Sequence, residues 1–204
     1  MFADIIKYNQ HFPTCVGYFR RVNVDKRILN SEQRLKESFI DLMKKNDPSE
    51  ITVKRLCTDA GLNRSTFYDR FGYLDRLIES IINDCMDSVC EAGEVSIAAG
   101  IQKENISKEE IRAYIERYRS NDLLVQFSKS KQSGKYFYFI IKALVRISMK
   151  SRPDTVGYYP AFFQNSGVLS ILLEWINNGQ DVSEEQIIDI IQEFSRAMFH
   201  KYEC

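Results

Sequence analysis

The stretch Ile51–Phe71, ITVKRLCTDAGLNRSTFYDRF, decides the fold predicted for this chain. Apolar residues recur in it at helical spacing on both sides of a three-residue turn. Thr52 and Asn63 are residue types that cap helix N-termini, and Gly61 can take the positive φ that closes a helix. The spacing therefore predicts one helix after Thr52, a tight turn, and a second short helix over 64–70.

The two predicted helices match the helix-turn-helix pattern. In that pattern the first helix braces the second, and the second presents its N-terminal residues to the DNA major groove. Arg, Ser and Thr side chains can bond base edges or phosphates, and the phenol of Tyr68 suits a phosphate oxygen. A plain helical hairpin with a solvated polar face is the alternative. The predicted inward side chains are Val53, Leu56, Ala60, Leu62, Phe67 and Phe71, and the outward ones are Arg64, Ser65, Thr66, Tyr68 and Asp69.

Helical signals continue on both sides of the motif. Before it, an apolar stripe follows Asn30, which we expect as an N-cap with Gln33 at capping-box spacing. The segment Asn46-Asp47-Pro48 is expected to end that helix. After the motif, an apolar stripe from near Tyr73 to Cys85 predicts a fourth helix. The motif is therefore the centre of a small helical domain.

The C-terminal half has helix signals of its own. Ser107 with Glu110 and Ser183 with Gln186 have capping-box spacing. Pro160 is expected to begin a helix, because its missing N–H costs little in the first turn. No segment shows convincing β alternation, so we predict an all-α chain of about nine helices. The predicted helices cover 107–118, 123–128, 135–150, 160–178 and 183–198, with a connection through Gly93 and Gly100 and a loop over 152–159.

The composition is that of an ordinary globular protein. The 204 residues are 44% hydrophobic and 27% charged, with 28 basic and 28 acidic side chains. This balance excludes a disordered chain, and the chain taken whole has no net positive charge of the kind that marks a general polyanion binder. Residues 1–29 mix aromatic residues with a basic cluster, which indicates either an unstructured arm or a basic arm that lies along nucleic acid.

Other classes of protein are disfavoured by missing motifs. No run approaches the roughly 18 apolar residues of a membrane span, and no signal peptide is apparent. Five cysteines without a C-x-x-C pair favour free thiols and a cytoplasmic location. Phosphate-binding glycine loops are missing, and His11 and His200 are the only histidines. We therefore expect no enzyme activity, no cofactor and no metal site.

Residue by residue, Ile51–Phe71 resembles the DNA-binding signature of TetR-family transcriptional regulators, and the match runs from about Asn30 to Ile82. The resemblance implies a three-helix helix-turn-helix domain on an all-α regulatory domain. In that family the regulatory domain dimerises through its last two helices and commonly holds a small-molecule pocket. The C-terminal half, around Pro160–Phe163 and Leu173–Gly179, is similar to a subgroup related to dihydroxyacetone-kinase regulators. The implied divisions are an arm at 1–29, a DNA-binding domain at 30–76, and an effector-binding and dimerisation domain at 77–204.

The resemblance also implies which residues meet DNA. Side chains at the start of the first motif helix would face phosphates, and those at the start of the second would contact bases. The family often carries Lys where this chain has Leu74, and Leu74 cannot bond a phosphate. Tyr73 can replace that contact through its hydroxyl or the helix N-terminus. The implied DNA contacts are Thr52, Arg55, Arg64, Ser65, Thr66, Tyr68 and Tyr73.

The last two predicted helices are apolar on more than one side. A helix of that kind packs on its own core and on a neighbour, so four such helices from two subunits would form a bundle. The alternative is that these residues only fill the core of one chain. The predicted homodimer interface consists of Val168, Leu172, Trp175, Ile176, Ile187, Ile191 and Phe194.

Aromatic residues are concentrated in the C-terminal half. They predict either an aromatic cavity for a mostly apolar effector or a tightly packed core. The pocket candidates are Tyr114, Tyr118, Phe127, Phe137, Phe139, Tyr159 and Phe163.

Together, these features predict a homodimer that binds a palindromic double-stranded DNA operator, with recognition helices about 34 Å apart. The resemblance implies a repressor tuned by a small molecule. The alternative is an interaction module whose C-terminal domain binds a protein partner.

Overall fold

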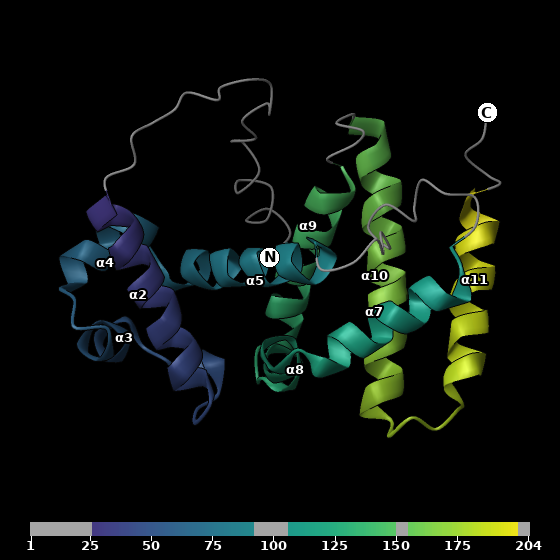
Figure 1. The fold of residues 1–204 in the computed structure, drawn as a ribbon, viewed down its shortest axis with the longest axis horizontal. Helices are drawn as coiled ribbons and strands as arrows, with labels where there is room; N and C mark the ends of the chain where they lie inside the picture. The colour runs from purple at the N-terminus through teal and green to yellow at the C-terminus, as the bar shows by residue number, and fades with distance from the viewer. Residues whose placement is uncertain (1–25, 92–105, 150–154, 200–204) are drawn as a thin grey trace, which may run out of the picture.

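The computed structural model describes residues 26–91, 106–149 and 155–199 (Figure 1). These ranges hold nine α-helices and one 3₁₀ helix and contain no strand, which confirms the predicted all-α class. Most of the predicted arm and the connection through Gly93 and Gly100 lie outside the described residues. The elements are α2 (Lys26–Met43), η2 (Pro48–Glu50), α3 (Val53–Asp59), α4 (Arg64–Phe71), α5 (Leu74–Glu91), α7 (Lys108–Ser120), α8 (Asp122–Lys129), α9 (Ser133–Ser148), α10 (Thr155–Asn177) and α11 (Glu184–Phe199).

The helices form two groups. Figure 1 shows α2, α3 and α4 together at one end, and α9, α10 and α11 toward the other, with α5 running between them to cross α9. Ion pairs accompany the packing of α5 on α9: Lys135 binds Asp75 at 2.8 Å and Lys142 binds Glu79 at 3.0 Å. The helix that follows the helix-turn-helix segment is therefore attached directly to the C-terminal group.

The N-terminal group is built on the predicted apolar positions. Leu56, Ala60, Phe67 and Phe71 are buried, and the remaining two inward positions are half-buried and pack against the same core. Polar bonds then join α2 to the end of α3, since the Ser38 hydroxyl donates to the Asp59 carboxylate at 2.6 Å. The predicted motif is thus held by both apolar and polar contacts.

The first helix begins earlier than predicted. It starts at Lys26, so Asn30 lies within α2 and does not cap it. Gln33 instead donates to Glu37 at 2.9 Å, one turn further along the same helix. Polar residues at capping-box spacing also suit a solvated helix face, where side chains four apart bond each other. The N-terminal helical group therefore includes residues 26–29, which the predicted division had placed in the arm.

The longest helix also begins earlier than predicted. α10 starts at Thr155, so Pro160 lies inside it and residues 155–159 are helical rather than loop. Proline at that position removes one i→i−4 hydrogen bond and leaves the rest of the helix intact. The ring of Tyr158 stacks on Phe162 with 6.1 Å between centroids, which stabilises the turn around Pro160.

Capping explains the remaining boundaries of the C-terminal group. Ser107 and Glu110 form the predicted capping box at the start of α7. Ser183 and Gln186 exchange the same pair of bonds at the start of α11. Gly179, with φ of +73°, follows the end of α10, as predicted. Among the described residues, no helix is long and apolar enough to cross a membrane.

Candidate nucleic-acid interface

The helix-turn-helix segment is fixed by a cap at the start of α3 and by backbone bonds in the turn that leads to α4. The Thr52 hydroxyl accepts from the backbone N–H of Arg55 at 3.3 Å, as predicted for an N-cap. Gly61 has φ of +60°, and the N–H of Leu62 then returns to the carbonyl of Cys57 at 2.9 Å. Asn63 occupies the N-cap position of α4 with extended backbone, but its side chain makes no capping bond. The start of α4 therefore depends on the turn rather than on that side chain.

Helix α4 is anchored by one face and leaves the other accessible. Phe67 is fully buried, and Phe71 is buried next to it with 6.0 Å between ring centroids. Tyr68 is 54% exposed, and its ring meets Phe67 edge-on at 5.4 Å. Of the residues predicted to contact bases, Arg64 and Ser65 are exposed and Thr66 is half-buried. The buried rings of Phe67 and Phe71 thus fix α4 with its polar side on the surface.

The residues predicted to contact phosphates also lie on the surface. Thr52 and Arg55 are exposed at the first turn of α3. Tyr73 is exposed directly before α5, and the Arg76 guanidinium lies over its ring at 5.0 Å from the centroid. Leu74 is half-buried and packs on the core, so it is withdrawn from that surface. Tyr73 is therefore accessible, and its contact with a phosphate stays a prediction.

The charge of Arg64 also affects the underlying core. Burial raises the pKa of the Cys57 thiol, and the nearby Arg64 guanidinium opposes that rise. The net shift is upward, so the thiol stays protonated at neutral pH. A neutral Cys57 serves as core packing below the recognition helix.

Two residues near this surface were not predicted from the sequence. Asn46 accepts a hydrogen bond from Arg55 at 2.9 Å, from the Arg55 Nη1 atom to the Asn46 Oδ1 atom. Arg34 donates from Nη2 to the carbonyl oxygen of Ala60 at 2.7 Å. Both contacts join α2 or its end to α3. No local pattern signals them, because the partners are 9 and 26 residues apart in the sequence.

The structure divides the predicted pocket residues. Tyr114, Tyr118 and Phe127 are buried, and Phe137 and Phe139 are half-buried. Tyr159 and Phe163 are 70% and 66% exposed, so their placement in an interior pocket is corrected. They occupy the outer face of α10, because the inner face is taken by residues such as Ala161 and Asn165.

Most of the residues predicted to form the dimer interface are buried within their own chain. Phe194 is 64% exposed and Ile176 is half-buried. The other five are buried in the core of their own chain, so as they lie they cannot contact a partner: Val168, Leu172, Trp175, Ile187 and Ile191. Trp175 illustrates the reason, since its Nε1 atom donates to the carbonyl of Val182 at 2.9 Å within the same chain.

Comparison with known proteins adds information on the fold. No family model matches the chain, and no curated protein matches it. Fourteen solved chains match, among them RolR in complex with its ligand resorcinol, with 14% identity and a TM-score of 0.52 over 86% of this chain and 88% of that one. A second is the TetR family repressor AlkX from Dietzia sp. strain DQ12-45-1b, implicated in n-alkane biodegradation, with 17% identity and a TM-score of 0.46 over 83% of this chain and 95% of that one. A third is the dihydroxyacetone kinase operon activator DhaS, with 17% identity and a TM-score of 0.45 over 85% of this chain and 98% of that one. At these identities the likeness concerns the fold alone, and the fold shared with RolR is the all-α fold that the sequence predicted.

Proposed function

We propose that this chain is a sequence-specific DNA-binding transcriptional regulator. The observation that carries the proposal is the two-sided character of α4. Phe67 and Phe71 are buried on one side, while Arg64, Ser65 and Tyr68 are accessible on the other. A short helix that is fixed in this way can enter a major groove without rearrangement. The resemblance to the TetR family implies a repressor.

The regulator acts as a homodimer on a palindromic operator. On α10 the exposed residues Tyr159, Phe163, Gly167 and Ser170 lie on one face of the helix. On α11, Ile190 and Phe194 are exposed one turn apart. The helices run antiparallel, so the first half of α10 and the last half of α11 lie at the same end (Figure 1). Exposed aromatic groups on adjoining helices support a contact with a second copy, which buries them in a four-helix bundle.

The effector is a small, mostly apolar molecule that binds among the buried aromatic residues of the C-terminal group. Tyr114, Tyr118 and Phe127 come from α7 and α8 and are buried together with Tyr136 of α9. Burial raises the pKa of Tyr118, so its phenol stays neutral and can orient a polar group of the effector. RolR, the structure with resorcinol bound, supports a small-molecule effector for a chain of this fold. Binding acts by favouring one of two arrangements of the DNA-binding domains.

The proposal is tested by selecting bound sequences from a random DNA pool with the purified chain. A palindromic site is expected, and Arg64→Ala is expected to weaken binding about tenfold or more, the range for loss of a base contact. Tyr68→Phe is expected to weaken it by about two- to tenfold, the range for one hydrogen bond. Tyr138→Phe on α9 is the matched control, since Tyr138 is a similarly exposed tyrosine in the other group. A pool without an enriched sequence would refute the proposal.

A further inference from the structure

Asn46, in the turn between α2 and η2, binds Arg55, the side chain that we expect to contact a phosphate. The amide of Asn46 uses both of its ends: Oδ1 accepts from Nη1 of Arg55 at 2.9 Å, and Nδ2 donates to the carbonyl of Leu42 at 2.7 Å. The bond to Leu42 fixes the amide against the last turn of α2. The bond to Arg55 then limits the directions that this exposed guanidinium can take. A flexible arginine loses less conformational entropy on binding DNA when it is already oriented.

The next residue, Asp47, binds the C-terminal group. Its carboxylate accepts from the backbone N–H and the hydroxyl of Ser49 at 2.8 and 2.6 Å, which caps η2. The same carboxylate accepts from the Ser130 hydroxyl at 2.6 Å and from the backbone N–H of Lys131 at 2.9 Å. Ser130 and Lys131 form the turn between α8 and α9. One side chain thus closes a turn in the DNA-binding domain and holds a turn of the regulatory domain.

The hydrogen bonds to Asp47 keep its carboxylate ionised at neutral pH. Burial alone would raise the pKa of Asp47, but the hydrogen bonds from Ser130, Ser49 and Lys131 outweigh burial and hold the pKa well below its usual range. Asp47 is therefore ionised throughout the physiological range, and bonds to an ionised acceptor are stronger than neutral ones. An ion pair between Lys131 and Glu50 supports the same turn.

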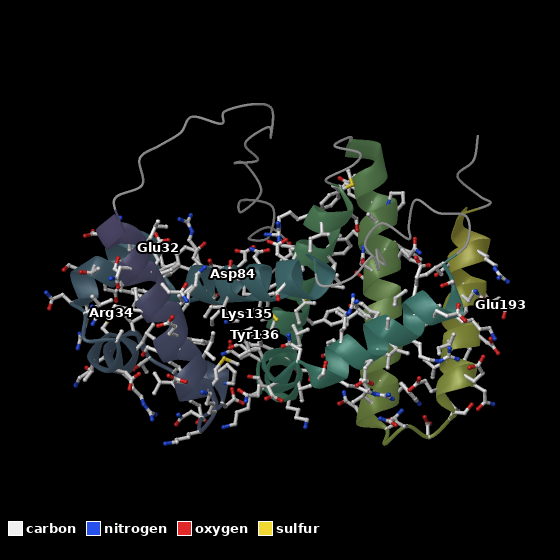
Figure 2. The ribbon with its side chains drawn as sticks, in the orientation of Figure 1. Glu32, Arg34, Asp84, Lys135, Tyr136 and Glu193 are labelled. Atoms are coloured by element: carbon white, nitrogen blue, oxygen red, sulfur yellow. The ribbon has the colours of Figure 1, made fainter. Side chains whose placement is uncertain are left out.

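The α8–α9 turn also borders the buried aromatic residues. Ser130 is the C-cap of α8, and Tyr136 lies in the first turn of α9 with its ring edge-on to Phe127 at 5.0 Å. Figure 2 shows Lys135 and Tyr136 where the N-terminal group meets the C-terminal helices. A ligand that displaces Phe127 or Tyr136 would therefore move the turn that Asp47 holds.

We propose that Asn46 and Asp47 are positioning residues for DNA binding. Asp47 ties the α2–η2 turn to the α8–α9 turn, and Asn46 transmits the position of that turn to Arg55. This gives the regulatory domain a route to a phosphate contact that is separate from the packing of α5 on α9. The proposal rests on the proposed function, because it requires that Arg55 contacts operator DNA.

A double-mutant cycle tests the role of Asn46. Operator affinity is measured by fluorescence anisotropy at several salt concentrations for the full-length wild type, Asn46→Ala, Arg55→Ala and the double variant. Arg55→Ala is expected to weaken binding about three- to tenfold and to reduce the salt slope by about one for each subunit. Asn46→Ala is expected to weaken binding about two- to fivefold, the lower part of the range for one hydrogen bond, and to have no effect when Arg55 is already absent.

The outcomes separate the two proposals. If the wild type binds no selected sequence, the proposed function fails. If the wild type binds its operator but the effects of Asn46→Ala and Arg55→Ala simply multiply, the function stands and the positioning role of Asn46 is overturned. The melting temperature of each variant is measured alongside, because a purely structural role of Asn46 would lower stability without changing the salt slope.

Ser130→Ala tests the link to the regulatory domain without removing Asp47. It deletes the bond at 2.6 Å and leaves both bonds from Ser49 in place. We expect operator affinity to change about two- to fivefold in the wild type and not at all in the Arg55→Ala background. Ser130→Thr, which keeps the hydroxyl, should restore the wild-type affinity. An unchanged affinity for Ser130→Ala in a folded protein, or an equal effect in both backgrounds, would overturn the link.

Discussion

Arg34 of α2 donates a hydrogen bond to the carbonyl oxygen of Ala60, at the end of α3, over 2.7 Å. The same Nη2 atom lies 3.0 Å from the position that a Cβ atom on Gly61 would occupy. The turn between α3 and α4 is therefore closed by a side chain from another helix as well as by its own backbone. Its geometry depends on Gly61 for two reasons, the positive φ and the lack of space.

Gly61→Ala is expected to destabilise the protein by about 1–2 kcal/mol. The substitution places a side chain at φ of +60°, a conformation that costs roughly this amount outside glycine. It also pushes against Arg34. The free energy of unfolding is measured by urea denaturation. Gly134→Ala in α9 is the control, because none of the described atoms lies within 4 Å of the added Cβ there. Similar losses for both variants would contradict the explanation.

Phe67 and Tyr68 are neighbours in α4 with opposite expected roles. Phe67→Ala removes a fully buried ring and is expected to cost about 3–5 kcal/mol of stability. Tyr68→Ala removes an exposed ring and is expected to change stability by less than about 1 kcal/mol, while operator binding weakens. Thermal unfolding and DNA binding are measured on both variants. A strong loss of stability in Tyr68→Ala would show that α4 faces the other way.

The motif could be predicted from sequence because several local rules agree there. Thr52 at a cap, Gly61 at a positive φ and Phe67 at an inward position each restrict the same short segment. Two helix starts that were each predicted from a single residue type were placed too late in the chain. Asn30 fits a cap but lies inside a longer helix, and Pro160 fits a helix start but is tolerated within α10.

The contacts that join the two groups could not be predicted in this way. Ser130 and Asp47 are 83 residues apart, so no periodicity connects them.

The faces of α10 were ambiguous for another reason. Its apolar residues surround the helix, and periodicity cannot decide whether Val168 or Phe163 faces inward. Only the packing of α9 and α11 against α10 shows that Val168 is buried and Phe163 exposed.

The exposed face of α10 and α11 predicts the effect of charge on dimerisation. Phe163→Arg and Phe194→Arg are expected to convert a dimer into a monomer, because each places an unpaired charge in a contact that would be desolvated. Analytical ultracentrifugation measures the molar mass. Leu29→Arg is the matched control, since Leu29 is an exposed apolar residue of α2, at the other end of the molecule. A dimer that persists in both variants would place the interface elsewhere.

Asp47 predicts how stability depends on acid. The pKa of its carboxyl in the folded state lies well below the ordinary value of 3.8, so the unfolded chain takes up the proton first as the pH falls. The contribution of Asp47 to stability is therefore complete above about pH 5, where the carboxyl is ionised in both states, and is lost progressively as the pH falls through 3.8. Asp47→Asn should flatten this acid dependence, since asparagine does not titrate and still suits the cap of η2.

The test is the free energy of unfolding by urea between pH 5 and pH 2 for the wild type and Asp47→Asn. Asp41→Asn, an exposed carboxylate of α2 that pairs with Lys44, controls for the change in net charge. The difference between wild type and Asp47→Asn should be constant above about pH 5 and shrink on acidification, because protonation removes from the wild type the charge-assisted bonds that the variant already lacks. A difference that stays constant down to pH 2 would mean that Ser130 and Lys131 do not favour the ionised form of Asp47.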